Sequence, residues 1–332
     1  MKTRIALIYG GEGHEHEISL SSASTVAELL DKEKYELLPI LITKGGEWTF
    51  ANGGAPTYPV YYGGKSGFLS DGGIIECEAA LPILHGECGE DGKIPGALET
   101  ARIKFVGCKT LAGAVCSDKI LTRAVADSLG IPGARWIYAT KCDPLPEAVA
   151  EAERRLSYPM FVKPSGLGSS IGAGAARDRR ELFRAITEAR DLSRDGRILI
   201  EELVPVKYEI ECAYFDDGTP LFSASGVIDT GGSFYDFSRK YSNPDGIKIS
   251  HGLLPDEKIK SQAESYARSL ARALDLCGMA RIDFFLTEEG DLYFNEINTV
   301  PGMTKTSLYP YLCEDAGVMR DKIMERLLAT LL

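Results

Sequence analysis

Three oxygen-bearing side chains near the carboxyl end of the chain could together bind a metal ion. After Asp283, residues 284–294 run from apolar residues through turn residues to apolar residues again, a pattern typical of a β-hairpin. A hairpin brings its two ends together, so Asp283 should meet Glu296 and Asn298, whose two-residue spacing puts both side chains on one strand face. Hard oxygen ligands of this kind suit Mg²⁺ bound partly through substrate phosphates. A hairpin with charged ends and no metal is the alternative.

A glycine-containing loop upstream could receive those phosphates. It spans residues 163–170, begins with Lys163 and contains Gly166 and Gly168. Glycines let backbone N–H groups approach an anion closely, and the lysine adds charge at the end of a predicted strand. The Gly-Lys-Ser/Thr signature of a P-loop is missing, so a surface hairpin loop is the alternative. Lys119, at the start of a predicted helix, is a second candidate phosphate ligand only if Lys163 also binds phosphate.

A third segment could hold the base and sugar of a nucleotide. Residues 199–204 leave a predicted strand and enter a turn before Pro205. Such a segment can offer backbone edges to an adenine, and Glu209 is placed to reach ribose hydroxyls. By itself this pattern is weak evidence.

Composition narrows the class of protein. The chain has 332 residues, a formal net charge of −11 and no cluster of Lys and Arg, which argues against a nucleic-acid partner. Its apolar runs are too short for a signal peptide or a membrane span. None of the eight cysteines falls in a Cys-x-x-Cys pair, and most sit in apolar stretches, so we expect reduced thiols in a cytoplasmic protein.

The first third of the chain alternates predicted strands with predicted helices. Strands are expected at 4–9, 37–42, 79–84 and 103–106, and helices at 18–30, 94–101 and 118–129. This alternation predicts a parallel sheet with right-handed crossovers. Residues 45–73 should form loops or short edge strands.

From residue 134 onwards the pattern favours an α+β arrangement with antiparallel pairing. Strands are expected at 134–139, 160–163, 197–201, 209–215 and 221–228, and helices at 146–156, 178–190, 256–274 and 318–331. Residues 230–250 have no periodicity and are rich in Gly, Asn, Pro and aromatic residues. A structureless stretch of this length is usually functional.

Seven motifs occur in a characteristic order. They are Gly10-Gly11 with Glu15-His16-Glu17-Ile18-Ser19, Leu84-His85-Gly86 with Gly89-Glu90-Asp91-Gly92, Ser117-Asp118-Lys119, Lys163-Pro164-Ser165 with Gly168-Ser169-Ser170, Phe234-Tyr235-Asp236 with Lys240-Tyr241, Arg281-Ile282-Asp283, and Asn295-Glu296-Ile297-Asn298 through Pro301-Gly302-Met303-Thr304. In this order and spacing the chain resembles the ATP-grasp superfamily, and within it the D-alanine–D-alanine ligases, over nearly its whole length.

The resemblance implies a fold of α/β and α+β parts: an ATP-grasp fold with an N-terminal parallel α/β (pre-ATP-grasp) domain. The implied domains are residues 1–113 (substrate domain), 114–205 (central ATP-grasp subdomain) and 206–332 (C-terminal subdomain), with 230–250 as a mobile active-site lid. The implied ligands are ATP, two molecules of D-alanine and two Mg²⁺ ions, with Mn²⁺ as a substitute. The product would serve peptidoglycan synthesis, and the family is generally homodimeric.

The resemblance also implies roles for individual residues. ATP would be held by Lys119, Lys163, Glu201, Glu202, Val204, Glu209 and Lys240, and the metal by Asp283, Glu296 and Asn298. The first D-alanine would bind at Glu15, linked to Ser169 and Tyr241, with His85 nearby. Arg281 and the backbone N–H of Gly302 would stabilise the oxyanion, and Ser307 and Leu308 would receive the second D-alanine. Gly166-Leu167 stands where some members have charged residues, a departure from the family pattern.

Other classes of function fit less well. A dinucleotide-binding oxidoreductase would need a third glycine where His16 stands. His14 and His16 flank Glu15 but have no third metal ligand in the sequence. A non-catalytic nucleotide-binding protein is disfavoured by the intact set of metal-binding and phosphate-binding residues. Within the ligases, Tyr241 argues against D-lactate as the second substrate and the apolar Leu308 argues against D-serine, so D-alanine is expected at both positions.

Overall fold

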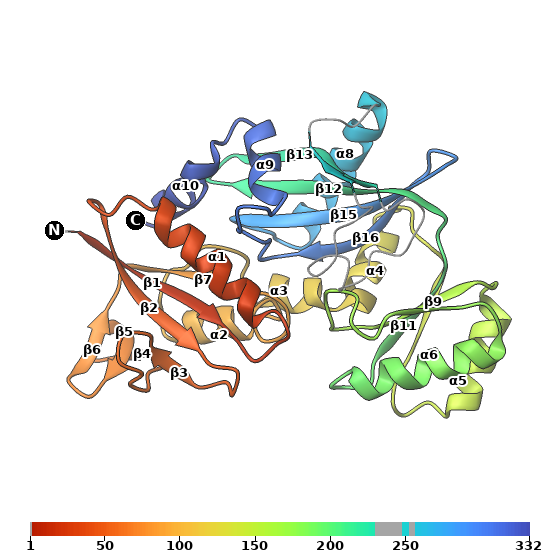
Figure 1. The fold of residues 1–332 in the computed structure, drawn as a ribbon, viewed down its shortest axis with the longest axis horizontal. Helices are drawn as coiled ribbons and strands as arrows, with labels where there is room; N and C mark the ends of the chain where they lie inside the picture. Colours follow the sequence, from red (N-terminus) through yellow and green to blue (C-terminus); the bar gives the residue numbers. More distant parts are fainter. Residues whose placement is uncertain (1, 230–247, 252–255) are drawn as a thin grey trace.

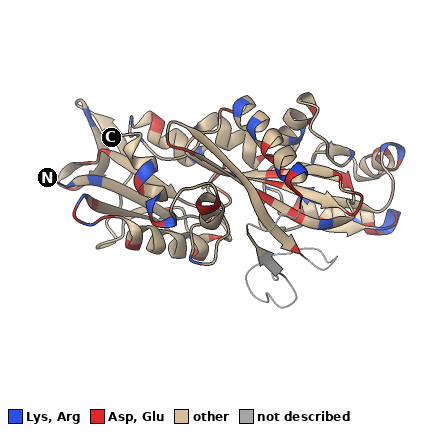
Figure 2. Ribbon diagram, turned by 90° about the horizontal axis from the view of Figure 1, so that it is seen from above, with Lys and Arg blue, Asp and Glu red and all other residues tan. Residues whose placement is uncertain are grey.

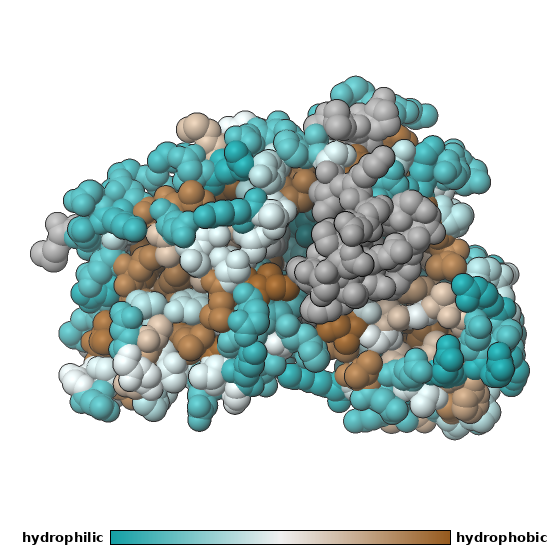
Figure 3. All heavy atoms as spheres, viewed as in Figure 1, coloured by the Kyte–Doolittle hydropathy of each residue, from teal (hydrophilic) through white to brown (hydrophobic). Residues whose placement is uncertain are grey.

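The computed structural model describes residues 2–229, 248–251 and 256–332, which form four β-sheets. One sheet lies near the N-terminus, one belongs to a lobe with two helices at the lower right, and the largest crosses the top and centre (Figure 1). The two chain ends lie close together at the left, and the two lower lobes are separated by a notch in the space-filling view (Figures 1 and 3). Basic and acidic residues are interspersed along the ribbon (Figure 2).

The N-terminal sheet has the order β3-β2-β1-β7. Its strands and their helices are β1 (Thr3–Gly10), α1 (His16–Leu29), β2 (Tyr35–Ile42), β3 (Trp48–Phe50), β7 (Ala79–Ile83) and α2 (Lys93–Thr100). β1 pairs in parallel with both β2 and β7, which confirms the predicted parallel sheet. A small antiparallel sheet of β4 (Pro59–Tyr62), β5 (Lys65–Ser70) and β6 (Gly73–Glu76) lies beside it.

The predicted strand at 103–106 is wrong. Phe105 makes only an isolated parallel bridge to Ala80, although Ile103 and Val106 are buried. The run is bracketed by Arg102 and Gly107, both with positive φ. Left-handed residues at both ends leave too little extended chain for a longer ladder.

The central sheet has the order β10-β9-β11-β8, with antiparallel neighbours throughout. Its elements, with the two helices that precede it, are α3 (Thr110–Ser117), α4 (Lys119–Ser128), β8 (Trp136–Ala139), α5 (Leu145–Arg155), β9 (Met160–Pro164), β10 (Gly174–Ala176), α6 (Arg179–Leu192) and β11 (Ile198–Glu202). Asp118 and Asp178 cap α4 and α6 by accepting hydrogen bonds from backbone N–H groups of the first turn. α5 and α6 pack their apolar faces on this sheet around Val149, Leu182 and Ile186.

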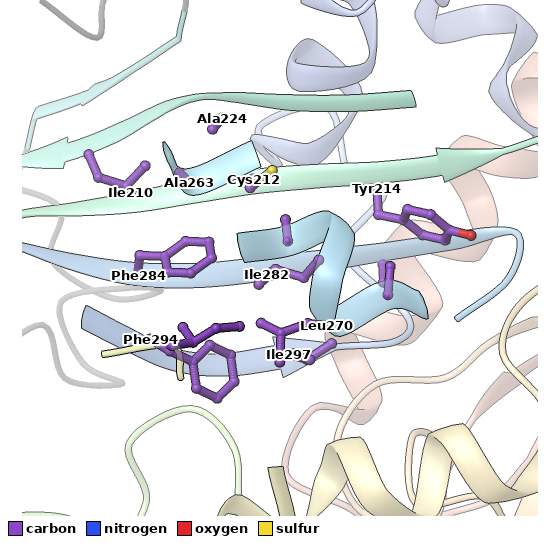
Figure 4. Packing of buried hydrophobic residues seen from close by; sticks show 14 of the residues in the cluster. Ile210, Cys212, Tyr214, Ala224, Ala263, Leu270, Ile282, Phe284, Phe294 and Ile297 are labelled. Atoms are coloured by element: carbon purple, nitrogen blue, oxygen red, sulfur yellow. The ribbon is translucent and has the colours of Figure 1, made fainter. Parts of the chain in front are cut away.

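The largest sheet has the order β14-β13-β12-β15-β16. Its strands and the helices that follow are β12 (Val206–Asp216), β13 (Pro220–Asp229), β14 (Lys248–Ser250), α8 (Glu257–Ala273), β15 (Met279–Thr287), β16 (Leu292–Asn298), α9 (Tyr309–Asp315), the 3₁₀ turn Arg320–Lys322 and α10 (Ile323–Ala329). α8 contributes Ala263 and Leu270 to a core that includes Ile282, Phe284 and Phe294 of the strands (Figure 4). The predicted hairpin is thus formed by β15 and β16, with β16 at one edge of this sheet.

Two predictions in this region need correction. Residues 248–250, expected to be structureless, form β14, which pairs with β13; the rest of the predicted lid up to residue 247 lies outside the described residues. The helix expected at 318–331 is divided into a 3₁₀ turn and the short α10. Met319, just before the turn, has extended backbone and is largely exposed, so the apolar pattern there overstated the length of the helix.

One apolar core joins the beginning of the chain to its end. Ile5 and Leu81 of the N-terminal sheet share a cluster with Phe215 of β12, Leu312 of α9 and Ile323 of α10. This packing brings the loops at the carboxyl ends of β1 and β7 next to the segment after β16. The loops carry Glu15 and His85, and the segment carries Gly302 and Ser307.

The structure also bears on membrane-spanning helices and on the state of the cysteines. Across the described ranges, no helix is both long and apolar enough to cross a membrane. All eight cysteines lie in the described part of the chain and are free thiols, as predicted.

Candidate active site

A cleft of about 820 Å³ separates the central sheet from the β12-β15-β16 face of the large sheet. It is lined by residues predicted to bind nucleotide and metal, namely Lys119, Lys163, Glu201, Glu202, Val204, Glu209, Asp283 and Glu296, and by Arg281, which was predicted to stabilise the oxyanion. These side chains and backbone segments come from four separate stretches of the sequence. The fold therefore collects the predicted phosphate and metal residues into one place.

The hairpin brings the three candidate metal ligands together. Asp283 of β15 pairs directly with Glu296 of β16, and Asn298 pairs with Arg281. The amide of Asn298 donates a hydrogen bond to Asp283 Oδ2 at 3.1 Å, so the two side chains touch. This meeting of Asp283, Glu296 and Asn298 is the one predicted from the hairpin pattern.

The same three side chains make an open, oxygen-rich donor set. Within the described ranges, no three His, Cys, Asp or Glu side chains converge into a metal cage. A cation beside Asp283 and Glu296 would therefore need the oxygen of Asn298 and further oxygens from a ligand such as phosphate. That requirement fits Mg²⁺, which usually retains ligands from water and substrate phosphates.

Two lysines point into the cleft and are held by acidic partners. Lys163 Nζ lies 2.6 Å from Glu201 Oε1 and donates a hydrogen bond to Asn295 Oδ1 at 3.2 Å. Lys119 Nζ lies 3.2 Å from Glu296 Oε2 and donates to the carbonyl of Leu167 at 2.8 Å. Both side chains are largely buried and lie beside a carboxylate, so each ammonium group is fixed in position before any anion arrives.

The end of β11 and the residues after it also border the cleft. The carboxylate of Glu202 accepts hydrogen bonds from the backbone of Ser157 and from Arg135, outside the set of cleft-lining residues. The Glu202 carboxylate is therefore engaged by residues outside the cleft. Two aromatic residues that sequence reasoning missed, Phe161 and Phe285, also line the cleft and give it apolar walls. Only their positions on β9 and β15, near Lys163 and Asp283, could have indicated that they line the cleft.

Glu15 lies immediately before α1 and contacts the glycine-containing loop. Ser169 Oγ, from the glycine-containing loop, donates a hydrogen bond to Glu15 Oε1 at 2.6 Å. Gly86 has a φ of +67°, and a Cβ built there would lie 2.3 Å from Glu15 Oε2. Glycine at position 86 thus leaves room for the carboxylate, and Glu15, Ser169 and the loop after β7 meet as the motifs suggested.

His85 is buried and has both ring nitrogens engaged. Nε2 lies 2.9 Å from Ser22 Oγ and Nδ1 lies 2.9 Å from the carbonyl of Val300. Burial lowers the pKa of His85, so the neutral imidazole is favoured. Ser22 Oγ also accepts a hydrogen bond from the backbone N–H of Met303 at 3.3 Å. His85 therefore holds the segment that contains Gly302.

Glu90 was named in a motif but given no role. It lies beside His85, with Oε1 3.9 Å from Nδ1. Burial, and after it the charge of Glu15, raises the pKa of Glu90 well above its usual value. No sequence pattern predicts the burial of Glu90, because the residues that bury it are distant along the chain.

Arg281 lies between two carboxylates. It makes a two-pronged contact with Asp283, at 2.8 and 2.7 Å, and its Nε lies 3.3 Å from Glu211 Oε1. Burial alone would lower the pKa of Arg281, but Asp283 and Glu211 outweigh it and raise the pKa well above its usual value. The guanidinium is a permanent positive charge next to the candidate metal site.

Gly302 and Ser307 are adjacent across a tight turn. A Cβ at Gly302 would lie 2.8 Å from Ser307 Oγ, which in turn accepts a hydrogen bond from the N–H of Thr304 at 3.0 Å. Leu308 packs on the core that joins the chain ends, and its side chain closely approaches Gly226. Lys240, Tyr241 and the motif at 234–236 lie outside the described residues.

Comparisons with known proteins identify the family of this chain. Two family models match: "D-ala D-ala ligase C-terminus" over residues 125–329 and "D-ala D-ala ligase N-terminus" over residues 4–58. The chain is 37% identical to the D-alanine--D-alanine ligase of Deinococcus radiodurans, covering 98% of each chain. It is 36% identical to that of Acetivibrio thermocellus, covering 98% of this chain and 95% of the relative.

Solved structures agree on the architecture. The VanG D-Ala:D-Ser ligase of Enterococcus faecalis matches with a TM-score of 0.90 at 30% identity, covering 100% of both chains. D-alanyl-alanine synthetase A of Vibrio cholerae matches with a TM-score of 0.87 at 30% identity, covering 99% of this chain and 98% of the other. The predicted ATP-grasp fold is confirmed by this likeness. With a family model over more than half of its length and relatives that match almost end to end, the chain belongs to the D-alanine–D-alanine ligase family.

Proposed function

We propose that this protein joins two molecules of D-alanine into D-alanyl-D-alanine, converting ATP to ADP and phosphate, and so supplies a precursor for peptidoglycan. The observation that carries the proposal is the single cleft in which Lys119 and Lys163 face the Asp283–Glu296 pair. Phosphoryl transfer needs this combination, because its catalysis is mostly positioning and neutralisation of charge.

The first step would activate a carboxylate. An oxygen of the first D-alanine attacks the γ-phosphorus of ATP, the bond to the β-phosphate oxygen breaks, and ADP and an acyl phosphate result. Lys119 and Lys163 would hold the phosphates, and Glu15 would hold the ammonium of the first D-alanine. Mg²⁺ bound by Asp283, Glu296 and Asn298 would neutralise charge on the transferred group.

The second step would form the peptide bond. The second D-alanine attacks the acyl carbon as a free amine, a carbon–nitrogen bond forms, and phosphate leaves. Negative charge develops on the carbonyl oxygen in between, and fixed donors such as the Arg281 guanidinium and the Gly302 N–H suit that charge. Ser307 and Leu308 would receive the second substrate.

D-serine as the second substrate is the competing possibility, because the VanG neighbour is named as a D-Ala:D-Ser ligase. Leu308 lies in an apolar cluster, which suits the methyl group of D-alanine better than a hydroxymethyl group. A hydroxyl is rejected only weakly by an apolar pocket, so D-serine should still react slowly.

The test is phosphate release by the purified protein with ATP, MgCl₂ and D-alanine, followed by competition among D-alanine, D-serine and D-lactate as acceptors. We expect D-alanine-dependent phosphate release and a product that contains two D-alanine residues. Phosphate release that does not depend on an amino acid would contradict the ligase proposal. A product dominated by D-alanyl-D-serine or D-alanyl-D-lactate would contradict the choice of acceptor.

Other parts of the proposal rest on the family resemblance. They are the domain boundaries at 113/114 and 205/206, a homodimer, a cytoplasmic location, Mn²⁺ in place of Mg²⁺, and contacts of Lys240 with phosphate and of Tyr241 with Glu15. Light scattering of the purified protein tests the dimer, and metal titration of phosphate release tests the choice of cation.

A further inference from the structure

The Asp118 carboxylate is the centre of a hydrogen-bond cluster just outside the cleft. Oδ1 accepts from the backbone N–H groups of Ile120 and Leu121, at 2.9 and 3.1 Å, and from Ser165 Oγ at 2.6 Å. Oδ2 pairs with the guanidinium of Arg197. The Asp118 side chain is only 13% exposed and Ser165 is buried, whereas the Arg197 side chain is 32% exposed.

The cluster joins three segments that each carry a residue of the cleft. Asp118 precedes Lys119 at the start of α4, and Ser165 lies two residues after Lys163 at the end of β9. Arg197 immediately precedes β11, whose far end carries Glu201, the partner of Lys163. One carboxylate thus ties together the supports of both cleft lysines.

Backbone contacts reinforce the same junction. The N–H of Lys119 donates to the carbonyl of Ser165, and the N–H of Ser165 donates to the carbonyl of Arg197, each at 3.0 Å. Lys119 Nζ also reaches the carbonyl of Leu167, in the loop that continues to Ser169. The separation between the two lysine ammonium groups therefore depends on how α4 is docked on the ends of β9 and β11.

We propose that Asp118 is a positioning residue that sets the spacing of Lys119 and Lys163 for the phosphates of a bound nucleotide. The proposal deepens the ATP-dependent function proposed above and rests on it for the identity of the ligand. Asp118 does not line the cleft, so it acts through the two lysines and does not touch the nucleotide itself.

The alternative is that Asp118 serves only as a helix cap. A cap contributes about 1 kcal/mol of stability, and its loss would affect folding without a selective effect on nucleotide binding. Asp178 provides the matched control, because it caps α6 through the N–H of Glu181 at 2.8 Å and is exposed. The two aspartates share the capping role and differ in their connection to the lysines.

The experiment measures ADP binding by calorimetry in the presence of MgCl₂, and steady-state KM values for ATP and D-alanine, for Asp118→Ala and Asp178→Ala. We expect Asp118→Ala to raise the Kd of ADP and the KM of ATP about tenfold, because the lost hydrogen bonds involve a charged group and contribute more free energy than neutral ones. The KM of D-alanine at saturating ATP should change less than about twofold, since the Glu15 site is intact. Asp178→Ala should lower Tm and leave ADP affinity unchanged.

Ser165→Ala covers the case in which Asp118→Ala does not fold, because it keeps the cap and removes only the link to β9. It should weaken ADP binding in the same direction, by less. The proposal is overturned by wild-type ADP affinity in folded Asp118→Ala, or in Ser165→Ala if the first variant is unfolded. A parallel rise of both KM values also overturns it.

The test of Asp118 is separate from the test of the ligase function, because ADP binding needs no amino acid. A wild-type protein that binds ADP but does not respond to D-alanine would refute the ligase function and leave the test of Asp118 intact.

Discussion

Ser169 Oγ donates a hydrogen bond of 2.6 Å to Glu15 Oε1 across 154 positions of the sequence. The contact joins the glycine-containing loop of the central sheet to the start of α1. It places one residue from the proposed phosphate region next to the proposed ammonium-binding carboxylate. Binding of nucleotide and binding of the first amino acid are therefore adjacent in space, as a transfer between them requires.

Substitution of Glu15 by Gln should separate these two binding events. Removing the negative charge weakens the contact with an ammonium group, and hydrogen bonds between charged partners are worth about 1.5–3 kcal/mol. We expect the KM of the first D-alanine to rise at least about tenfold, with ADP affinity within about twofold of wild type. Steady-state kinetics and calorimetry measure the two quantities. A selective loss of ADP affinity would place Glu15 in the nucleotide site instead.

Gly86 offers a steric test of the same carboxylate. In Gly86→Ala the new methyl group would lie 2.3 Å from Glu15 Oε2, so the carboxylate must move. Left-handed backbone also costs a non-glycine residue about 1–2 kcal/mol. We expect lower stability together with a raised KM for D-alanine, measured by thermal unfolding and by kinetics.

Gly130→Ala is the control for backbone strain in that comparison. Gly130 has a φ of +68°, close to the +67° of Gly86, but a Cβ there meets nothing within 4 Å. It should lose similar stability and keep the KM of D-alanine. Equal KM values in the two variants would mean that Gly86 matters only through its backbone.

Glu296→Gln tests the candidate metal site. The change keeps the size of the side chain and removes a charge that faces both Lys119 and the Asp283 position. We expect turnover to fall at least about a hundredfold and the Mg²⁺ concentration for half-maximal activity to rise. Glu289→Gln, at the exposed turn of the same hairpin, should behave as wild type. A fully active Glu296→Gln would show that the metal binds elsewhere.

The sequence predicted the hairpin well because its information is local. Apolar runs on both sides of a turn define the pairing of Asp283 with Glu296, and the large sheet then preserves it. The short helices α3 and α9 were not predicted. α3 contains Ala112, Gly113 and Ala114, which give little amphipathic pattern, and the segment could not be distinguished from a loop.

The site was predicted where a motif names the reacting residue and missed where a residue acts through others. Lys163 was predicted because it begins a glycine-containing loop at the end of a predicted strand, and Lys119 was a second candidate that depended on Lys163. Asp118 was quoted only as part of a motif, since its partners Ser165 and Arg197 lie 47 and 79 positions away. Burial and distant partners are properties of the fold, and one sequence without its fold does not reveal them.

The buried pair His85 and Glu90 predicts two opposing effects of pH on stability. Burial lowers the pKa of His85 below its usual 6.5. The contribution of the neutral imidazole to stability is therefore complete above pH 6.5. It is lost as the pH falls below 6.5, because the unfolded chain then takes up a proton more readily than the folded protein. Burial, and then Glu15, raises the pKa of Glu90 above its usual 4.5. Its contribution is complete below pH 4.5 and is lost as pH rises through the folded pKa.

Glu90→Gln should therefore make the protein lose stability more steeply on acidification than the wild type does. The variant removes the group that becomes stabilising at low pH and retains His85, which becomes destabilising. Thermal unfolding between pH 7.5 and 5.0 measures the effect, with His85→Gln as the matched variant of opposite sign. Identical pH profiles for wild type and Glu90→Gln would mean that Glu90 is ionised in the folded protein, because only a carboxyl group that is neutral when folded gives this dependence.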